Sequence, residues 1–575
     1  MQMNRTAIVA ATASTLLSVG TAGAAEILVT SDIAVSTTWT ADNTYNLQQQ
    51  IFVLPGATLT IEPGTVIAST TGLGGSLAVC RGAKIDARGT QADPIIFTSK
   101  ADVATWTNGD SKTGAWRASA NEWGNLTIMG RAYIGKYGAA GSPNTATPNA
   151  ANDTQMEGLV AAFAGDPNVR YGGGNDSDDS GTLSFVSLRY GGKVIGLGNE
   201  LNGLSLGGIG GETVIDHIEI MNNVDDGIEI WGGTVNLNYF SIWNVGDDSF
   251  DIDQGWRGKA QFGLIVQGYS VGAAQGSGVG DNCIETDGAE RSDAQPVTTG
   301  CCYNLTVIGQ PISGDHATAW RDNARMQYRN SIFMDLGEQL VRNDNDGGEG
   351  QGGFGFNGTL TFPQTWSTEA SFTSPVNPFP NPGLAYRAQQ VPGKLAEIRD
   401  SVMVRNLNSN AYTGANTVGV FGAGNDNIDA GSDEASMPIA GIVRGEPVTP
   451  FGSLVMLPVI SLDPRAVNAA ATSVSAAPSD GFFVPANYRG AFSPTENWLC
   501  NWTAADAFGF SVPAPGGCEI AGPCPADLNG DGNVNAADLS ELLGAWGTAG
   551  GDVDGNGSTD AADLAVLLGA WGVCN

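Results

Sequence analysis

The stretch VIDHIEIMNNVDDGIEIWGGTVNLNYFSIWNVGDDSFDID, residues 214–253, repeats its own pattern after 22 residues. Apolar side chains recur at this interval in the sets Ile218–Phe240–Phe262, Ile220–Ile242–Leu264, Ile228–Phe250 and Ile230–Ile252. Short strands repeated at this length are typical of a parallel β-helix, in which each turn of the helix, or rung, buries its apolar side chains on the rung below. Leucine-rich repeats have a similar length, but their Leu and Asn pattern and their helical segments are missing. The repeat therefore predicts a mainly β fold built as a parallel β-helix.

Other parts of the chain carry the same short alternating segments, interrupted by Gly and Pro. They lie at residues 51–69 and 76–99, and again at 330–336 (NSIFMDL) and 400–406 (DSVMVRN). Gly-rich insertions at roughly 137–180, 270–280 and 343–393 are expected to be loops that leave the stack.

Composition restricts the class of partner. The 575 residues include 59 Asp and Glu against 26 Lys and Arg, which gives a formal net charge of −33. Such a chain is not expected to bind nucleic acid or an anionic membrane surface. Its 42% hydrophobic content is enough for a large core, so disorder is not expected either.

The first 24 residues are typical of a signal peptide, with an early Arg5, an apolar stretch and small residues before the expected cleavage point. No later apolar run is long enough to span a membrane. We therefore expect a secreted protein, either extracellular or at the cell surface, in which cysteines can pair. Of the eight cysteines, Cys524 and Cys574 are the favoured pair, and Cys283 is a plausible partner for Cys301 or Cys302.

Much of the chain between residues 50 and 510 resembles a family of exported bacterial β-helix proteins that are described only as uncharacterised and surface-exposed or secreted. The resemblance implies a right-handed parallel β-helix and export, and it implies no particular chemistry. The segments that carry it are IFVLPGATLTIEPGTVI (51–67), PIIFTS (94–99), EWGNLTIMGRA (122–132), LNGLSLGGIG (201–210), DDGIEIWGGTVN (225–236) and NYRGAFSPTENWLCNWT (487–503).

Three rungs carry acidic turns, VDDGIEI, GDDSFDID and GDNCIETD. Alignment stacks Asp225, Asp247 and Asp281 in one column, and Glu229, Asp251 and Glu285 in another. Carboxylates on neighbouring rungs, about 4.8 Å apart, repel one another unless a cation, a proton or good solvation intervenes. Three interpretations stay open: a catalytic site, a further calcium or glycan site, or solvated turns.

The catalytic interpretation rests on Asp247, Asp248 and Asp251, because GDDSFDID resembles a motif of polygalacturonase-type glycoside hydrolases. Their Gly-His-Gly and Arg-Ile-Lys motifs are absent, and the chain has only two histidines. His217 lies in an expected strand and has an expected structural role, and His316 lies in SGDHATAW. Lyase chemistry would instead need a basic residue over the groove, for which the chain offers Arg189, Arg257 and Arg321.

The C-terminal segment contains two acidic loops 25 residues apart, each with a glycine at the sixth position and an apolar helical stripe behind it. Two such loops in register predict two Ca²⁺ sites. The expected ligands are Asp527, Asn529, Asp531, Asn533, Asn535 and Asp538 in the first loop, and Asp552, Asp554, Asn556, Ser558, Asp560 and Asp563 in the second.

Loop-then-helix in duplicate, with Asp at position 12 of each loop, resembles a type I-like dockerin domain. The resemblance covers residues 524–575 and implies calcium-dependent folding and docking to a cohesin-like or other anchoring protein. Dockerins commonly carry hydroxyl residues at loop positions 10 and 11, where this chain has Ala536-Ala537 and Ala561-Ala562. The expected helices also lack Lys and Arg, so the familiar recognition residues are missing.

These observations predict four segments: a signal peptide (1–24), a β-helix body (25–510), a linker (511–523) and a small all-α dockerin-like domain (524–575). The leading interpretation is a secreted protein with a binding or structural body, attached by its calcium module to a surface or an assembly. The alternative is an enzyme, a hydrolase or lyase acting on polysaccharide, carried by the same anchor.

Overall fold

The computed structural model describes residues 25–136, 138, 150–159, 163–193, 201–269, 280–289, 296–322, 324–343, 360–369, 391–406, 419–432, 434–451, 454–515, 517, 526–528, 533–548, 550–553 and 557–573. The predicted signal peptide, the predicted Cys524–Cys574 pair and most of the Gly-rich insertions lie outside these residues.

In the described part of the chain, nine strands form one parallel sheet, here called the nine-stranded face. Each strand pairs with the next at the same position of successive rungs, as expected for a β-helix. In order along the sheet the strands are β4 (Gln50–Val53), β7 (Ser76–Val79), β10 (Leu126–Met129), β14 (Leu204–Ile209), β16 (Ile228–Gly233), β18 (Phe250–Asp253), β20 (Ile284–Asp287), β22 (Thr318–Arg321) and β25 (Val341–Asn343).

The rest of the stack is a second parallel sheet, which has seventeen strands among the described residues. Its early strands are β1 (Ala25–Val29), β2 (Thr37–Trp39), β3 (Asn43–Leu47), β5 (Thr58–Ile61), β6 (Val66–Ser69), β8 (Lys84–Arg88) and β9 (Ile95–Ser99). Its later strands are β13 (Gly181–Arg189), β15 (Val214–Met221), β17 (Asn236–Trp243), β19 (Lys259–Val266), β21 (Cys301–Ile308), β23 (Gln327–Arg329), β24 (Ile332–Met334), β26 (Glu397–Arg399), β27 (Val402–Val404) and β28 (Ile428–Asp429).

The second sheet covers two faces because its long strands bend in the middle. The first half of β13 pairs with β8, and its second half pairs with β9. The residue at the bend has a left-handed backbone, at Phe185 (φ 48°), His217 (52°) and Tyr239 (50°). These aromatic rings stack on one another, with His217 4.1 Å from Phe185 and 4.4 Å from Tyr239 between ring centroids. The predicted structural role of His217 agrees with this stack.

The strand register confirms the 22-residue interval in the middle of the chain. Ile218 lies opposite Phe240, and Ile230 lies opposite Ile252. All four side chains are fully buried in the interior of the stack. The interior is therefore a column of matching apolar side chains, which is what the repeat predicted.

The next rung is one residue longer, and the prediction for Phe262 and Leu264 is wrong. Phe240 lies opposite Gly263, so Phe262 falls at the bend and Leu264 faces outward. A shift by one residue moves each side chain to the other face of a strand. A Cβ atom at Gly263 would lie 2.2 Å from Cζ of Phe240, so only glycine fits above that ring.

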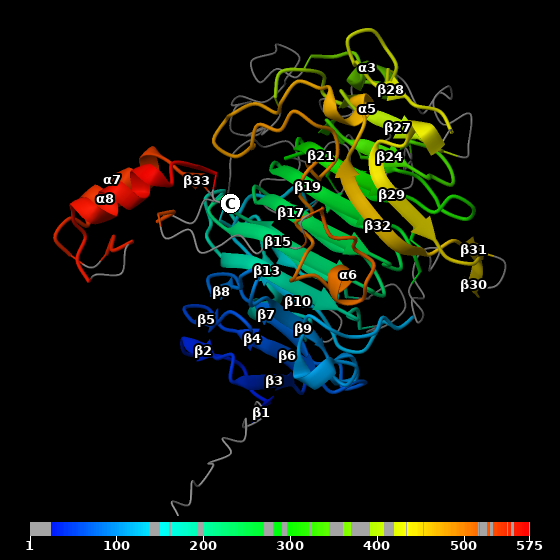
Figure 1. Cartoon of the computed structure of the whole chain (residues 1–575). Coiled ribbons are helices and arrows are strands. Elements are labelled where there is room, and N and C mark those ends of the chain that lie inside the picture. The colour runs from blue at the N-terminus through cyan, green and yellow to red at the C-terminus, as the bar shows by residue number, and fades with distance from the viewer. Residues whose placement is uncertain are drawn as a thin grey trace, which may run out of the picture.

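Residues 437–512, here called the C-terminal strap, cover the outside of the second sheet (Figure 1). The strap contains the antiparallel pair β29 (Ile439–Arg444) and β32 (Val459–Ala466), the hairpin β30 (Val448–Phe451) and β31 (Leu454–Met456), and the short helices α5 (Ala469–Thr472) and α6 (Ala504–Ala507). Its apolar side chains, including Leu462, Phe492, Trp498 and Trp502, pack on outward-facing residues of the stack such as Trp243 and Ile308.

The remaining short elements belong to loops. They are α1 (Lys100–Val103), η1 (Thr107–Gly109), η2 (Pro167–Val169), α3 (Phe362–Thr365), η6 (Glu434–Ser436) and the two-stranded pair β11 (Thr154–Gln155) with β12 (Arg170–Tyr171). No helix among the described residues is long and apolar enough to cross a membrane.

The cysteines of the stack are not paired with one another. Cys80, Cys283, Cys301 and Cys302 are buried free thiols, so the suggested pairing of Cys283 with Cys301 or Cys302 is wrong. Burial in the apolar interior raises the pKa of these thiols, to about 12 for Cys80 and Cys301. Cys500 of the strap is disulfide-bonded, to a partner outside the described residues.

The C-terminal unit contains two helices, α7 (Ala536–Gly544) and α8 (Ala561–Gly569), and a short antiparallel pair, β33 (Asn533–Val534) with β34 (Gly572–Val573). Figure 1 draws both helices beside the stack rather than within it. Leu542 and Leu567, which occupy equivalent positions of the two repeats, are fully buried between the helices.

Candidate functional site

One column of carboxylates runs along the nine-stranded face. Glu229 lies in register with Asp251, and Asp251 with Glu285, as the alignment of the acidic turns predicted. The next two rungs place Ala319 and then Arg342 at the same position. Because adjacent strands are about 4.8 Å apart, the column brings three acids close together and ends at the positively charged Arg342.

A second set of carboxylates lies in the turns before these strands. The main-chain N–H of Asp248 donates to Oδ1 of Asp226 at 2.9 Å, and the N–H of Asn282 donates to Oδ1 of Asp248 at 2.6 Å. Each of these Asp side chains therefore connects one rung to the next. Asp226 and Asp248 are 8% and 5% exposed, so solvated turns do not describe them.

The companion column predicted at Asp225, Asp247 and Asp281 is also found. The N–H of Gly246 donates to the carbonyl of Asp225 at 3.3 Å, and the N–H of Asp281 donates to the carbonyl of Asp247 at 3.0 Å. Asp225, Asp247 and Asp281 are less buried than Asp226 and Asp248.

The columns lead into an open cavity of about 290 Å³ in which acids predominate. It lies at the end of the nine-stranded face where Arg342 follows Glu285 and Ala319 in the column. The residues that line it are Asp247, Asp248, Asp281, Asn282, Glu285, Asp315, His316, Ala319, Arg321 and Arg342. The predicted catalytic candidates Asp247 and Asp248 are in this wall, and Asp251 lies behind it in the column.

Two carboxyl groups of the cavity have pKa values that are shifted in opposite directions. Burial, and then the hydrogen bond and charge of Asp315, raise the pKa of Asp281 to about 8. Burial alone would raise the pKa of Asp315, but hydrogen bonds with His316 and Asp281 outweigh it and lower that pKa below its ordinary value. At neutral pH the pair therefore consists of a protonated Asp281 and an ionised Asp315, a combination suited to acid–base chemistry.

Glu285 is the third titratable carboxyl of the cavity. Burial and the charge of Asp287 raise its pKa to about 7, although Arg321 opposes them. Arg321 lies 2.8 Å from an oxygen of Glu285 and 2.8 Å from an oxygen of Asp287. Burial alone would lower the pKa of Arg321, but the charges of Asp287 and Glu285 outweigh it and raise that pKa, so Arg321 is a stable cation and a poor base.

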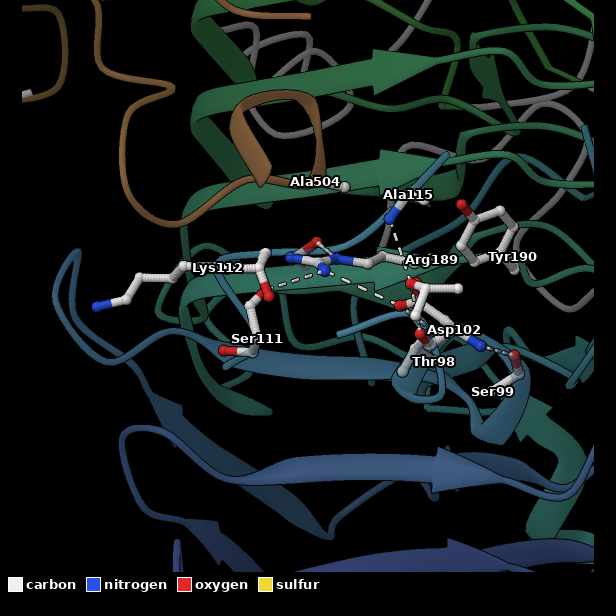
Figure 2. A network of polar contacts seen from close by, with 12 residues as sticks. Thr98, Ser99, Asp102, Ser111, Lys112, Ala115, Arg189, Tyr190 and Ala504 are labelled. Carbon is white, nitrogen blue, oxygen red and sulfur yellow. Dashed lines mark hydrogen bonds and ion pairs between the residues drawn. The ribbon is translucent and has the colours of Figure 1, made fainter. Parts of the chain in front are cut away.

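Of the three arginines considered as basic partners, only Arg321 lies in the cavity. Figure 2 shows the Arg189 side chain between Ser111 and Asp102, where its Nη1 donates to the carbonyl of Ser111 at 3.3 Å. Arg257 is fully buried and donates to Asp176 at 2.6 and 3.0 Å. Neither arginine lines the cavity, and both belong to other buried polar networks.

His316, Asp315 and Arg342 are cavity residues that the sequence did not assign to a site. Nδ1 of His316 accepts the N–H of Gln339 at 3.2 Å, and Nη1 of Arg342 lies 2.9 Å from Nε2. Nε2 lies 2.7 Å from Oδ1 of Asp315. Asp315 lies one rung beyond Asp281, at the 34-residue interval that also separates β18 from β20. Gly314-Asp315 repeats Gly280-Asp281, so this turn pattern was the signal that could have found it.

Several carboxylate groups of the face have a geometry that suits a hard cation. Within each group the possible ligand atoms lie within 4.8 Å of one another, as oxygens around one Ca²⁺ would. Among the described residues these groups are Asp225–Asp226–Asp247, Asp226–Glu229–Asp251, Asp247–Asp248–Asp281 and Asp315–His316–Glu338. The donor chemistry therefore fits the predicted further cation site.

Part of the predicted C-terminal calcium sites is described. Asp538 and Asp563, the last residues of the two loops, are fully buried, and each accepts the N–H of the residue three positions earlier, at 2.8 and 2.7 Å. These bonds form a capping box at the start of α7 and α8. Asp527, Asn533, Asn535, Asp552, Ser558 and Asp560 are also described, whereas Asn529, Asp531, Asp554 and Asn556 lie outside the described residues.

Only some of the apolar side chains on the two helices of the C-terminal unit are buried in its own core. Leu539 and Leu564 pack at its edge, while Leu543 and Leu568 are 52% and 53% exposed. Trp546 and Trp571 are likewise about half exposed.

Comparison with known proteins agrees with this architecture. The family model described as a pectate-lyase-like beta helix domain matches residues 31–359, which is more than half of the chain and includes the acidic columns and the cavity. No curated protein and no solved structure matches the chain. The strand register, the acidic face and this match lead to one assignment: the chain belongs to the family of pectate-lyase-like β-helix domains.

Proposed function

We propose that the protein cleaves a polysaccharide at the acid-lined cavity of its nine-stranded face. The observation that carries this proposal is the meeting of Asp281 and Asp315 in an open cavity that also contains His316, Arg321 and Arg342. A site that only binds a ligand has no need of two neighbouring acids that hold different protonation states at neutral pH. Membership of a pectate-lyase-like family supports a polysaccharide as the substrate class.

Hydrolysis is the reaction that these groups support best. A glycosidic bond breaks when a carboxylic acid protonates the leaving oxygen and a carboxylate activates water. Asp281, whose pKa is raised to about 8, is the acid in this proposal. Asp315 is the hydrogen-bonded partner of this acid, and His316 and Arg342 help to keep it ionised. The carboxylate that activates water has to stand about 5–9.5 Å from Asp281, because the two carboxyls of glycoside hydrolases flank the scissile bond.

Elimination is the second candidate, favoured by a specific group of oxygens. Asp247, Asp248 and Asp281 lie close enough together to hold a cation, which could bridge to the carboxylate of an acidic sugar. Elimination also needs a base that removes a carbon-bound proton. Arg321 is held by Glu285 and Asp287 and is poorly suited to that role, so elimination ranks below hydrolysis.

We further propose that the C-terminal unit is a calcium-dependent attachment module of an exported protein. Its support is the matched pair of capped helices, with equivalent buried carboxylates at Asp538 and Asp563. The half-exposed Trp546 and Trp571 offer an apolar contact surface for an anchoring protein. A cohesin-like partner would have to bind without the usual hydroxyl and basic recognition residues.

A panel of neutral and acidic polysaccharides tests the catalytic proposal. The full-length protein is assayed for reducing ends and for unsaturated, ultraviolet-absorbing products, with calcium and with a chelator. Reducing ends without unsaturation, in the presence of chelator, support hydrolysis. Calcium-dependent unsaturated products support elimination instead, and no product from any substrate contradicts cleavage.

Variants connect any activity to the cavity. Asp281→Asn and Asp315→Asn should each lower the rate by about 10²–10⁴-fold, the usual contribution of one acid–base group. Glu212→Gln removes one charge from an exposed turn and serves as the matched control. Activity that survives both cavity substitutions would place the reaction elsewhere in the molecule.

A further inference from the structure

Behind the open cavity, the nine-stranded face contains a closed group of three carboxylates: Asp226, Glu229 and Asp251. Asp226 ends the turn before β16, Glu229 lies in β16, and Asp251 lies opposite Glu229 in β18. Each of the three residues is 8% exposed. None of them is among the residues that line the cavity.

No cationic partner of these three acids is found in the described part of the chain. Among the described residues, no Lys or Arg forms an ion pair with Asp226, Glu229 or Asp251, although ion pairs serve Glu285 and Asp287 one rung further on. Their other close charges are also acidic: Asp225 and Asp247 act on Asp226, and the exposed Glu157 acts on Glu229. Buried charges in proteins are normally paired, neutralised by protons or bound to a metal ion.

A second observation points to a missing ligand. Oδ1 of Asp251 is buried and has no hydrogen-bond partner, while the Asp251 side chain is directed at Glu229, with which it interacts. Asn202, 3% exposed, donates its amide group to Oε2 of Glu229, yet its own Oδ1 is buried without a partner. Such buried, unsatisfied oxygen atoms are uncommon in proteins and require an explanation.

The geometry and the donor chemistry identify what could satisfy them. Ligand oxygens of Asp226, Glu229 and Asp251 lie within 4.8 Å of one another. Oxygens that share a Ca²⁺ ion, at about 2.3–2.6 Å from it, lie this close together. All three donors are carboxylate oxygens, the ligands that hard cations prefer over softer metals.

We propose that Asp226, Glu229 and Asp251 hold a structural Ca²⁺ ion inside the nine-stranded face, with the Asn202 carboxamide beside it. The site is separate from the cavity and from the C-terminal loops, and the proposal does not depend on the proposed catalytic function. The ion joins the turn that carries Asp226 to the neighbouring rung through Asp251. It also supplies the positive charge that the described protein groups do not provide.

The test needs only the metal and the full-length protein. The chain is stripped with a chelator and equilibrated with Ca²⁺, and the bound calcium per chain is measured by elemental mass spectrometry. Glu229→Gln preserves the shape of the side chain and removes its charge, and Glu212→Gln is the control with the same change of net charge on an exposed turn. Glu229→Gln should bind one Ca²⁺ fewer than the wild type and the control, or bind it at least tenfold more weakly.

Equal calcium binding by wild type and Glu229→Gln would overturn the proposal. If Glu229→Gln does not fold, a crystal of the wild type grown with Ca²⁺ decides the question by anomalous scattering. A peak surrounded by Asp226, Glu229 and Asp251 supports the site. Saturated C-terminal sites with no peak at this position overturn it, since a shared proton would then bridge the acids. Neither measurement involves a polysaccharide, so a failed activity assay leaves this result unaffected.

Discussion

Glu219 and Ala505 are 286 residues apart in the chain, yet the N–H of Ala505 donates to Oε1 of Glu219 at 3.0 Å. The N–H of Ala504 donates to the other carboxylate oxygen at 2.5 Å, and so does the hydroxyl of Ser187 at 2.6 Å. Glu219 is fully buried in β15, and Ala504 and Ala505 begin α6 of the strap. The Glu219 carboxylate therefore accepts the first N–H groups of α6 and connects the strap to the stack.

Replacement of Glu219 by Ala should lower the free energy of unfolding by about 2–4 kcal/mol, because it leaves two buried N–H groups and a hydroxyl without an acceptor. Urea unfolding followed by circular dichroism measures the change. Glu62→Ala, which removes an exposed glutamate from the turn before β6, should change stability by less than about 0.5 kcal/mol. A similar loss in both variants would show that Glu219 does not fasten the strap.

A second connection joins the strap to the stack through one carboxylate and two arginines. Asp335 accepts from Arg405 of the stack at 2.8 and 2.6 Å and from Arg444 of the strap at 2.8 Å. Asp335→Ala should cost about 2–3 kcal/mol, because it leaves two partly buried guanidinium groups without their counter-charge. Lys84→Ala breaks the exposed pair with Asp179 and should cost less than about 1 kcal/mol. Comparable losses from the two substitutions, measured by thermal and urea unfolding, would contradict this assignment.

In the absence of divalent cations, the stability of the stack should fall as the pH rises from about 4 to about 8. Burial raises the pKa of Glu285 to about 7 and of Asp281 to about 8, and it raises those of Asp248 and Asp251 as well. The folded chain then holds more protons than the unfolded chain, whose carboxyls titrate near 3.8 to 4.5. Proton linkage makes the unfolding free energy decrease with pH in that window.

Chelator-treated protein, unfolded in urea at a series of pH values, gives this slope directly. Glu285→Gln combined with Asp281→Asn should flatten the part of the slope between about pH 7 and 8, because these two groups titrate there. A stability that rises steadily from pH 4 to 8 would mean that the buried acids are ionised and paired in the folded chain.

If Asp281 is the acid of the proposed hydrolysis, activity should disappear as the pH rises through about 8, where Asp281 loses its proton. The pH dependence of kcat/KM on the best substrate of the panel measures this limb. Asp281→Asn should remove the limb together with most of the rate. Glu212→Gln should retain the wild-type profile. A limb that persists in Asp281→Asn would assign the acid to another group.

Calcium binding by the C-terminal unit should depend on Asp563. Its carboxylate accepts the N–H groups of Val553 and Asp560 at 2.8 and 2.7 Å, and it stands at the last position of the second loop. Asp563→Asn should weaken one Ca²⁺ site of the full-length protein by at least tenfold, as measured by calorimetry. Glu541→Gln, on the exposed side of α7, should not change calcium binding. Unchanged titrations of both variants would remove the basis for the second calcium loop.

The parallel β-helix and the acidic columns could be predicted because each rests on a short-range repeat. Ile218 and Phe240, or Glu229 and Asp251, are one rung apart in sequence and in space, so a constant interval reports a contact. The interval held for two rungs and failed at Gly263, where one added residue moved Phe262 to the bend. The rungs after Glu285 carry Ala319 and Arg342 at its position, so the column of acids stopped there. Asp315, His316 and Arg342 were therefore missed, although they complete the cavity.

The sequence by itself determined what repeats: the stacked apolar interior, the two columns of acids and the paired loop–helix units at the C-terminus. In a stack, residues one rung apart in the sequence touch in the structure. A repeat in the sequence therefore predicts which residues are in contact. Only the tertiary structure decided which acids are buried without a counter-charge, which arginine enters the cavity, and where the strap packs. Burial and charge pairing depend on segments that are hundreds of residues apart, such as Glu219 and Ala505, and no local pattern records such a contact.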